Sequence, residues 1–121
     1  KVVRREDVYR RELRAYRLFR ELSIGRIGKY KVPRFIDSDD SGLLLELTIV
    51  SAPYFLDFAS TYDELEMFHL DFSAEVWAER EQHWRDLFGE DWEAVKGARD
   101  QLLEVTGLMY LDLTPQNIRS R

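Results

Sequence analysis

The chain has 121 residues, of which 45% are hydrophobic and 34% charged, and it carries a net charge of −5. This length and composition predict one soluble globular domain rather than a disordered chain. The negative charge disfavours nucleic-acid and anionic-membrane partners, which select a basic surface. The sequence has no cysteine, which excludes disulfides and thiolate metal sites, and no apolar run long enough to span a membrane. We therefore expect a cytoplasmic protein.

The first predicted element is a helix from about Arg5 to Leu22. At about 100° per residue its apolar side chains share one face. That face holds Val8, Tyr9, Leu13, Tyr16 and Phe19. Glu12 lies in the middle of it, where a carboxylate is costly unless it meets a cation or hydrogen-bond donors. Two interpretations follow for Glu12. In the first, it faces a solvated groove or bonds an internal arginine; in the second, it holds a buried lysine in an active-site ion pair.

The second predicted element is a β-hairpin, which we expect to be antiparallel. Val32–Ile36 and Leu43–Val50 are the two strand-like runs, and the turn formers of Asp37–Gly42 join them directly. The helix before the hairpin should pack its Leu13 and Tyr16 face on this sheet.

A helical region is predicted from Tyr54 to Thr106. Ser73 is a candidate cap for one helix, and Asp91 is a candidate start for another, which Gly107 should end. Leu108–Leu111 follows as a short strand and Leu113–Asn117 as a loop. The order of helix, hairpin, helices, short strand and loop is that of an α+β fold with segregated parts.

The loop near the C-terminus carries the strongest chemical signal. Asp112 and Asn117 lie five residues apart after a strand, so their oxygens can converge in a loop. Asp112 could accept a proton from an attacking hydroxyl, and Asn117 could ligate Mg²⁺. On spacing alone, a helix-capping aspartate followed by a proline turn is the better interpretation, because the pattern D-x-x-x-x-N is common.

This loop resembles the catalytic loop of the protein-kinase-like fold, in particular its aminoglycoside and choline phosphotransferase branch, which reads H-G-D-L-x-P-x-N-I. The matching run is Tyr110-Leu111-Asp112-Leu113-Thr114-Pro115-Gln116-Asn117-Ile118. The resemblance implies that Asp112 is the catalytic base and Asn117 a magnesium ligand.

The resemblance extends along the chain in matching order. Tyr9–Tyr16 is similar to the helix whose glutamate, here Glu12, pairs with the nucleotide-binding lysine, and Lys1 stands where that lysine is expected. Leu43–Glu46 is similar to the strand that leads to the interlobe hinge. Lys1, Glu12 and Glu46 are therefore the predicted nucleotide-binding residues, and ATP and Mg²⁺ the implied cofactors.

The chain also departs from the family pattern. Tyr110 replaces the usual histidine and Leu111 the usual arginine or glycine. We find no Gly-rich loop before Lys1 and no second metal-binding aspartate after Asn117. We therefore expect a single incomplete domain, 1–121, with a small-lobe-like part (1–53) and a helical-lobe-like part (54–121), which alone transfers phosphate poorly or not at all.

Three functions remain open. The chain is part of an ATP-dependent phosphotransferase acting on a small-molecule or protein hydroxyl, or a non-catalytic kinase-derived binding module, or an unrelated small α+β scaffold. Because a partial domain exposes apolar surface, we also expect a homodimer or larger homo-oligomer.

Overall fold

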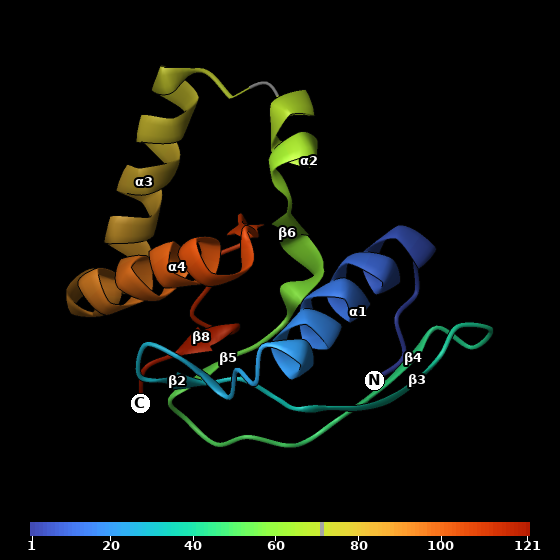
Figure 1. Ribbon diagram of the computed structural model, residues 1–121. Coiled ribbons are helices and arrows are strands. Elements are labelled where there is room, and N and C mark those ends of the chain that lie inside the picture. The colour runs from blue at the N-terminus through green and yellow to red at the C-terminus, as the bar shows by residue number, and fades with distance from the viewer. Residues whose placement is uncertain (71) are drawn as a thin grey trace.

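The structure, a computed structural model, describes residues 1–70 and 72–121. It is an α+β domain, which confirms the predicted class. A helix and a hairpin occupy one side of the molecule, two helices of similar length occupy the other, and short strands join them (Figure 1). No helix within these described ranges is long and apolar enough to cross a membrane.

Helix α1 spans Glu6–Glu21, within one residue of the prediction at each end. Acidic residues in its first turn and Arg20 in its last turn both complement the helix dipole. Its buried side chains are Tyr9, Glu12, Leu13, Ala15, Tyr16 and Phe19. The apolar stripe read from the sequence is thus the inner face of the helix, with Glu12 among its buried residues.

Strands β3 (Phe35–Asp39) and β4 (Leu44–Leu47) form the predicted antiparallel hairpin. Their bounds differ from the prediction at both ends. Val32 is not part of β3, because its N–H donates to the carbonyl of Gly25 (3.1 Å). Thr48 follows β4 and accepts a hydrogen bond from the N–H of Arg34 (2.8 Å), so residues 48–50 leave the strand.

Residues 1–3 run along the other edge of β4. The N–H of Leu45 donates to the carbonyl of Lys1 (2.8 Å), and the N–H of Val3 donates to the carbonyl of Leu43 (2.9 Å). These bonds fix the backbone of Lys1 beside the hairpin, under helix α1.

A four-stranded sheet links the two halves of the chain. Its strands, in spatial order, are β1 (Arg26–Ile27), β2 (Tyr30–Lys31), β5 (Tyr54–Phe55) and β8 (Ile118–Arg119). The pairing of β2 with β5 is parallel and the other two pairings are antiparallel. This sheet was not predicted, because β5 comes from the region assigned to helix.

The 3₁₀ turn η1 (Phe58–Ser60) and strand β6 (Thr61–Tyr62) follow β5. Strand β6 pairs with β7 (Met109–Tyr110), which confirms a short strand within Leu108–Leu111. The predicted helix from Tyr54 was wrong for residues 54–62, because pairing with distant strands decides the conformation of this segment.

Helix α2 (Glu64–His69) starts with a reciprocal cap. The carboxylate of Asp63 accepts from the N–H of Glu66 (2.8 Å), and the carboxylate of Glu66 accepts from the N–H of Asp63 (2.9 Å). No side chain of this short helix is buried.

Helices α3 (Ala74–Phe88) and α4 (Trp92–Thr106) are separated by the 3₁₀ turn η2 (Gly89–Asp91). Ser73 caps α3 as predicted, by accepting from the N–H of Val76 (3.2 Å). Gly107 ends α4 as predicted, in the left-handed conformation that glycine adopts readily at a helix C-terminus (φ 74°).

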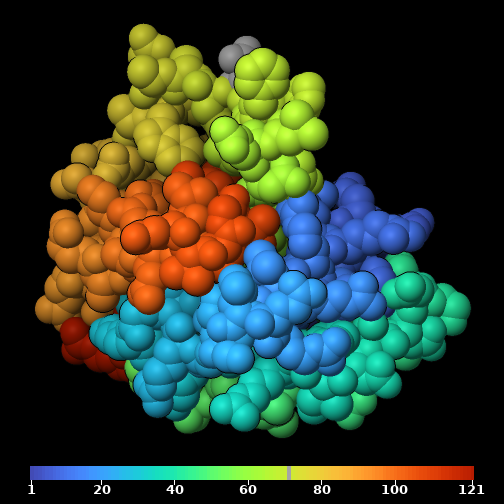
Figure 2. Space-filling model, viewed as in Figure 1, coloured from blue at the N-terminus to red at the C-terminus, as the bar shows by residue number. Residues whose placement is uncertain are grey.

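The core is a chain of aromatic rings that joins the two sides. Phe58 is fully buried; its ring stacks on Phe55 and meets Tyr16, Phe19 and Tyr110 edge-on. In Figure 2, α4 and the residues that follow α1 lie side by side on one face. The N–H of Gly28 donates to the side chain of Gln101 there (2.8 Å).

Candidate functional site

Lys1 and Glu12 form an ion pair between the strand-like residues 1–3 and helix α1. The Nζ atom of Lys1 lies 2.5 Å from Oε1 of Glu12. The backbone bonds to β4 position Lys1, and the helical periodicity turns Glu12 inward. The cation that Glu12 meets is therefore Lys1 rather than an internal arginine.

The carboxylate of Glu12 is fully buried, and its second oxygen, Oε2, has no hydrogen-bond partner among the described residues. Burial raises the pKa of Glu12, and the hydrogen bond and charge of Lys1 oppose that rise. Desolvation offsets much of the attraction in a buried ion pair, so such a pair is weak evidence of a stabilising role. A perturbed carboxyl beside a cleft is instead a candidate for a functional one.

A cleft of about 420 Å³ opens beside Lys1. Its size falls within the roughly 300–1,000 Å³ typical of small-molecule sites. Its walls come from α1, from the residues after β4, from the segment before η1 and from the loop before β8. The lining residues are Lys1, Tyr16, Pro33, Leu47, Thr48, Ile49, Val50, Leu56, Asp57 and Asn117. One wall is largely apolar, and Lys1, Asp57 and Asn117 supply the charged and amide groups.

Asp57 stands directly before η1 in the left-handed conformation (φ 61°, ψ 79°). Its Oδ1 accepts a hydrogen bond from the N–H of Ala59 (3.3 Å) and lies 3.8 Å from Nζ of Lys1. The next residue, Phe58, is anchored under α1 by the aromatic core, so the turn is fixed from below. The structure therefore holds a half-exposed carboxylate at the cleft, within reach of the Lys1 ammonium.

Asn117 reaches the same cleft from near the C-terminal end of the sequence. The N–H of Leu56 donates to the Asn117 carbonyl (2.7 Å), which places Asn117 beside the residue that precedes Asp57. The N–H of Asn117 donates to the carbonyl of Thr114 (3.1 Å), closing the loop that was predicted there. Asp57 and Asn117 thus approach one cleft from two distant parts of the chain.

Asp112 is exposed and does not line this cleft. Its N–H donates to Oγ of Ser60 (3.1 Å), and the N–H of Leu111 donates to the carbonyl of Ser60 (3.1 Å). Ser60 is the last residue of η1, so Asp112 is fastened to the same turn that Asp57 precedes. Glu46 is exposed on β4, one residue before the cleft wall begins at Leu47, and its nucleotide-binding role stays a prediction.

Asp57 was missed by the sequence analysis. A second carboxylate was sought only after Asn117, where the family order places it. No local motif marks Asp57, which simply follows the apolar Tyr54–Leu56. Only the pairing of β5 with β8 brings this segment next to the Asn117 loop.

The oxygen atoms at the cleft suit a hard cation. Among residues 1–70 and 72–121, no three His, Asp or Glu side chains gather into a metal-binding group. Magnesium, however, is commonly held by one or two protein oxygens together with substrate phosphates. Asp57 and Asn117 both line the cleft and carry a carboxylate and an amide, oxygen ligands of the type that magnesium takes.

The chain was compared with protein families, with characterised proteins and with solved structures, and none of the three comparisons gives a match.

Proposed function

We propose that the chain binds Mg–ATP in the cleft beside Lys1 and forms the nucleotide-binding part of a kinase-like phosphotransferase. One observation carries the proposal: Lys1, whose ammonium pairs with the buried Glu12, lines the same cleft as Asp57 and Asn117. A cation, a carboxylate and an amide in one cleft form the set needed to hold a magnesium–phosphate group.

The charges at the cleft favour a polyphosphate. Glu12 holds the Lys1 ammonium at the cleft, where it can neutralise phosphate oxygens. Asp57 and Asn117 would hold the magnesium ion, which would neutralise phosphate charge. The apolar wall formed by the last residue of β4, Leu47, and by Ile49 and Val50 after it offers a surface for a nucleotide base.

The order of the neighbouring segments supports a kinase-like arrangement. Residues 1–3, β4 and β3 lie side by side, and α1 crosses them carrying the glutamate that meets Lys1. In the family that the sequence resembles, the lysine strand, the hinge strand and the glutamate helix have the same relation. Asp57 would fill the place of the second metal-binding aspartate, from a different position in the chain.

The transfer reaction proposed for this site is an in-line displacement at the γ-phosphorus. A substrate hydroxyl oxygen forms the new bond to phosphorus, the bond from phosphorus to the β–γ bridging oxygen breaks, and ADP leaves. The hydroxyl proton passes to a carboxylate, the role proposed for Asp112. The backbone of Asp112 is hydrogen-bonded to Ser60, the last residue of η1, and the cleft residue Asp57 directly precedes this turn.

Calorimetric titration with Mg–ATP tests the binding step. Lys1→Met, Asp57→Asn and Asn117→Ala should each weaken binding by about tenfold or more, because each removes a contact of charged partners worth roughly 1.5–3 kcal/mol. Asparagine also tolerates the left-handed backbone, so Asp57→Asn changes mainly the charge. Lys29→Met, at another exposed lysine outside the cleft, is the control. Equal losses in the control and the site variants would contradict the proposal, as would no binding at all.

A second function is nucleotide binding without transfer. It is favoured by the position of Asp112 outside the cleft. Under this function Asp112→Ala should leave both Mg–ATP binding and ADP production unchanged. Under the phosphotransferase proposal it should leave Mg–ATP binding by this chain intact and reduce ADP production by the complete phosphotransferase by roughly 10²–10⁴-fold. Measuring both quantities on the same variant separates the two.

A further inference from the structure

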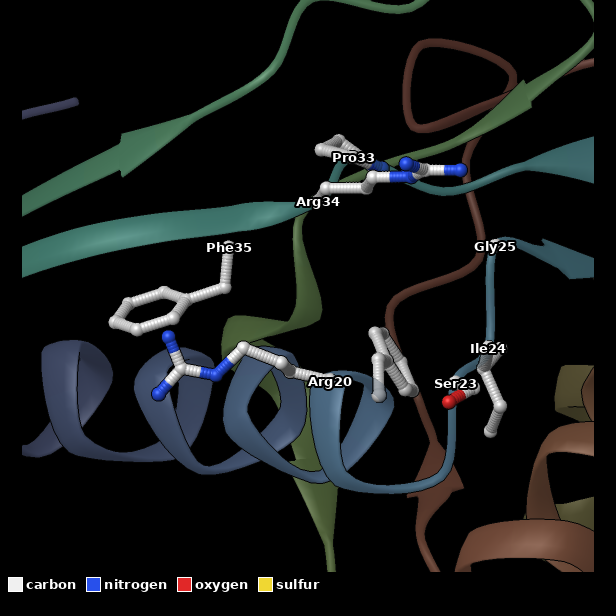
Figure 3. A pocket seen from close by; sticks show the side chains of 8 residues that line it. Arg20, Ser23, Ile24, Gly25, Pro33, Arg34 and Phe35 are labelled. Carbon is white, nitrogen blue, oxygen red and sulfur yellow. The ribbon is translucent and has the colours of Figure 1, made fainter.

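A second pocket, of about 410 Å³, lies between the C-terminal end of α1 and the start of β3 (Figure 3). Its apolar surface comes from Phe19, Ile24, Pro33 and Phe35. Pro33 also lines the nucleotide cleft, so the two pockets are neighbours, but they share no charged residue.

Two arginines line this second pocket. Arg20 comes from the last turn of α1 and Arg34 from the residue before β3. The guanidinium of Arg20 lies over the ring of Phe35, 4.6 Å from its centre, and the close-up shows the two side chains turned toward each other (Figure 3). The aromatic ring thus orients one of the two cations at the pocket.

Both arginines lack a carboxylate partner among the described residues. Other arginines of the same helix do have one: Arg10 pairs with Glu6, and Arg14 pairs with Glu66. No ion pair in residues 1–70 and 72–121 includes Arg20 or Arg34. In a chain of net charge −5, two unpaired arginines at one apolar pocket mark a local excess of positive charge.

We propose that this pocket binds a small aromatic anion, such as an aryl carboxylate or an aryl phosphate. Guanidinium groups recognise both anions through paired N–H donors, and aromatic and aliphatic side chains supply the surface for the ring. The pocket volume suits one such molecule. The proposal is independent of nucleotide binding, because neither arginine belongs to the cleft beside Lys1.

The probe is 2-naphthoate, titrated by calorimetry, with the neutral 2-naphthalenemethanol as its isostere. 2-Naphthoate should bind saturably and one-to-one, and the neutral compound about tenfold more weakly, because it cannot engage the guanidinium charge. Arg20→Gln and Arg34→Gln should each weaken 2-naphthoate by about tenfold. Arg4→Gln, at an exposed arginine outside the pocket, should leave its affinity within about twofold.

Thermal unfolding of each variant checks that the fold is kept. Phenyl phosphate in place of 2-naphthoate distinguishes the two anion types within the same proposal. Equal affinity for 2-naphthoate and 2-naphthalenemethanol would overturn the proposal, and so would the absence of 2-naphthoate binding in a folded protein. Tighter binding of a short acidic phenylalanine peptide than of 2-naphthoate would make the pocket a protein-docking site and overturn the small-molecule assignment.

Discussion

The Nε atom of Arg11 donates a hydrogen bond of 2.7 Å to the carbonyl oxygen of Ala59. This bond fastens α1 to η1, the turn that begins directly after Asp57. Arg14 makes a second hydrogen bond from α1, because its guanidinium donates to the carbonyl of Thr61 in β6, directly after η1 (2.8 Å). The helix that carries Glu12 and the turn that presents Asp57 are therefore held at a fixed distance.

Loss of the hydrogen bond from Arg11 to Ala59 should make the position of Asp57 less fixed. Arg11→Met keeps an unbranched apolar side chain but removes the donor to Ala59, together with the pair to Asp7 and the contact with the Tyr62 ring, so we expect a stability loss of about 1 kcal/mol. Mg–ATP binding should weaken several-fold, because Asp57 is less well positioned. Arg10→Met is the matched control: it removes only an exposed pair with Glu6 and should cost less than about 0.5 kcal/mol, without a change in affinity. Equal effects of the two variants would show that the Ala59 bond has no positioning role.

The raised pKa of Glu12 predicts how stability depends on pH. In the folded state the pKa of this carboxyl lies above its ordinary value of 4.5, chiefly because of burial. The folded protein then binds the proton more tightly than the unfolded chain. Glu12 therefore favours folding most below the unfolded pKa, and this contribution falls as pH rises through the folded pKa.

The test compares melting temperatures of Glu12→Gln and the parent protein from about pH 4 to about pH 8. Stability of the variant relative to the parent should increase as pH rises. Glu6→Gln, at an exposed first-turn carboxylate, should give a nearly constant difference. A parent that gains stability over Glu12→Gln with rising pH would mean that Lys1 outweighs burial.

Removal of the Phe58 ring should be among the most damaging single changes. Phe58 is fully buried and contacts rings from α1, β5 and β7. Phe58→Ala leaves a cavity there and should cost about 3–5 kcal/mol in chemical denaturation. Phe68→Ala removes the same group from a residue that is 83% exposed and should change stability by less than about 0.5 kcal/mol. Similar costs at the two positions would contradict this description of the core.

Substitution by alanine should change stability in opposite directions at two glycines, Gly97 within helix α4 and Gly107 at its C-terminal cap. Gly107 has a φ of 74°, where an added Cβ costs roughly 1–2 kcal/mol. Gly97 lies within the helix with nothing within 4 Å of an added Cβ, so Gly97→Ala should stabilise by about 0.5–1 kcal/mol. Urea unfolding of both variants measures the two signs, and a shared sign would contradict the cap assignment.

The elements predicted well were those with a strong local signal. Helix α1 follows from the spacing of its apolar residues, the β3–β4 hairpin from the turn at Asp37–Gly42, and the C-terminal end of α4 from Gly107. The strands β1, β2, β5 and β6 have two residues each, too few for a periodic pattern. Their conformation depends on partners that are distant in the sequence.

The candidate site was predicted in part for the same reason. Glu12 was found because it interrupts an apolar helix face, and Asn117 because of its loop motif. Asp57 has no such local mark. Its proximity to Lys1 depends on the bonds of residues 1–3 to β4, and its proximity to Asn117 depends on the pairing of β5 with β8. Neither contact is encoded in the residues adjacent to Asp57.

The position of β5 between β2 and β8 has a consequence for synthesis on the ribosome. Helix α1 and the β3–β4 hairpin consist of neighbouring residues and can form as soon as they emerge. Strand β5 gains its antiparallel partner only when residues 118 and 119 have left the exit tunnel. The hydrogen bond from Leu56 to Asn117 forms at the same stage. A nascent chain therefore carries Lys1, Glu12 and Asp57 for most of its synthesis without Asn117, and ligand-dependent protection from proteases should appear only after that length is reached.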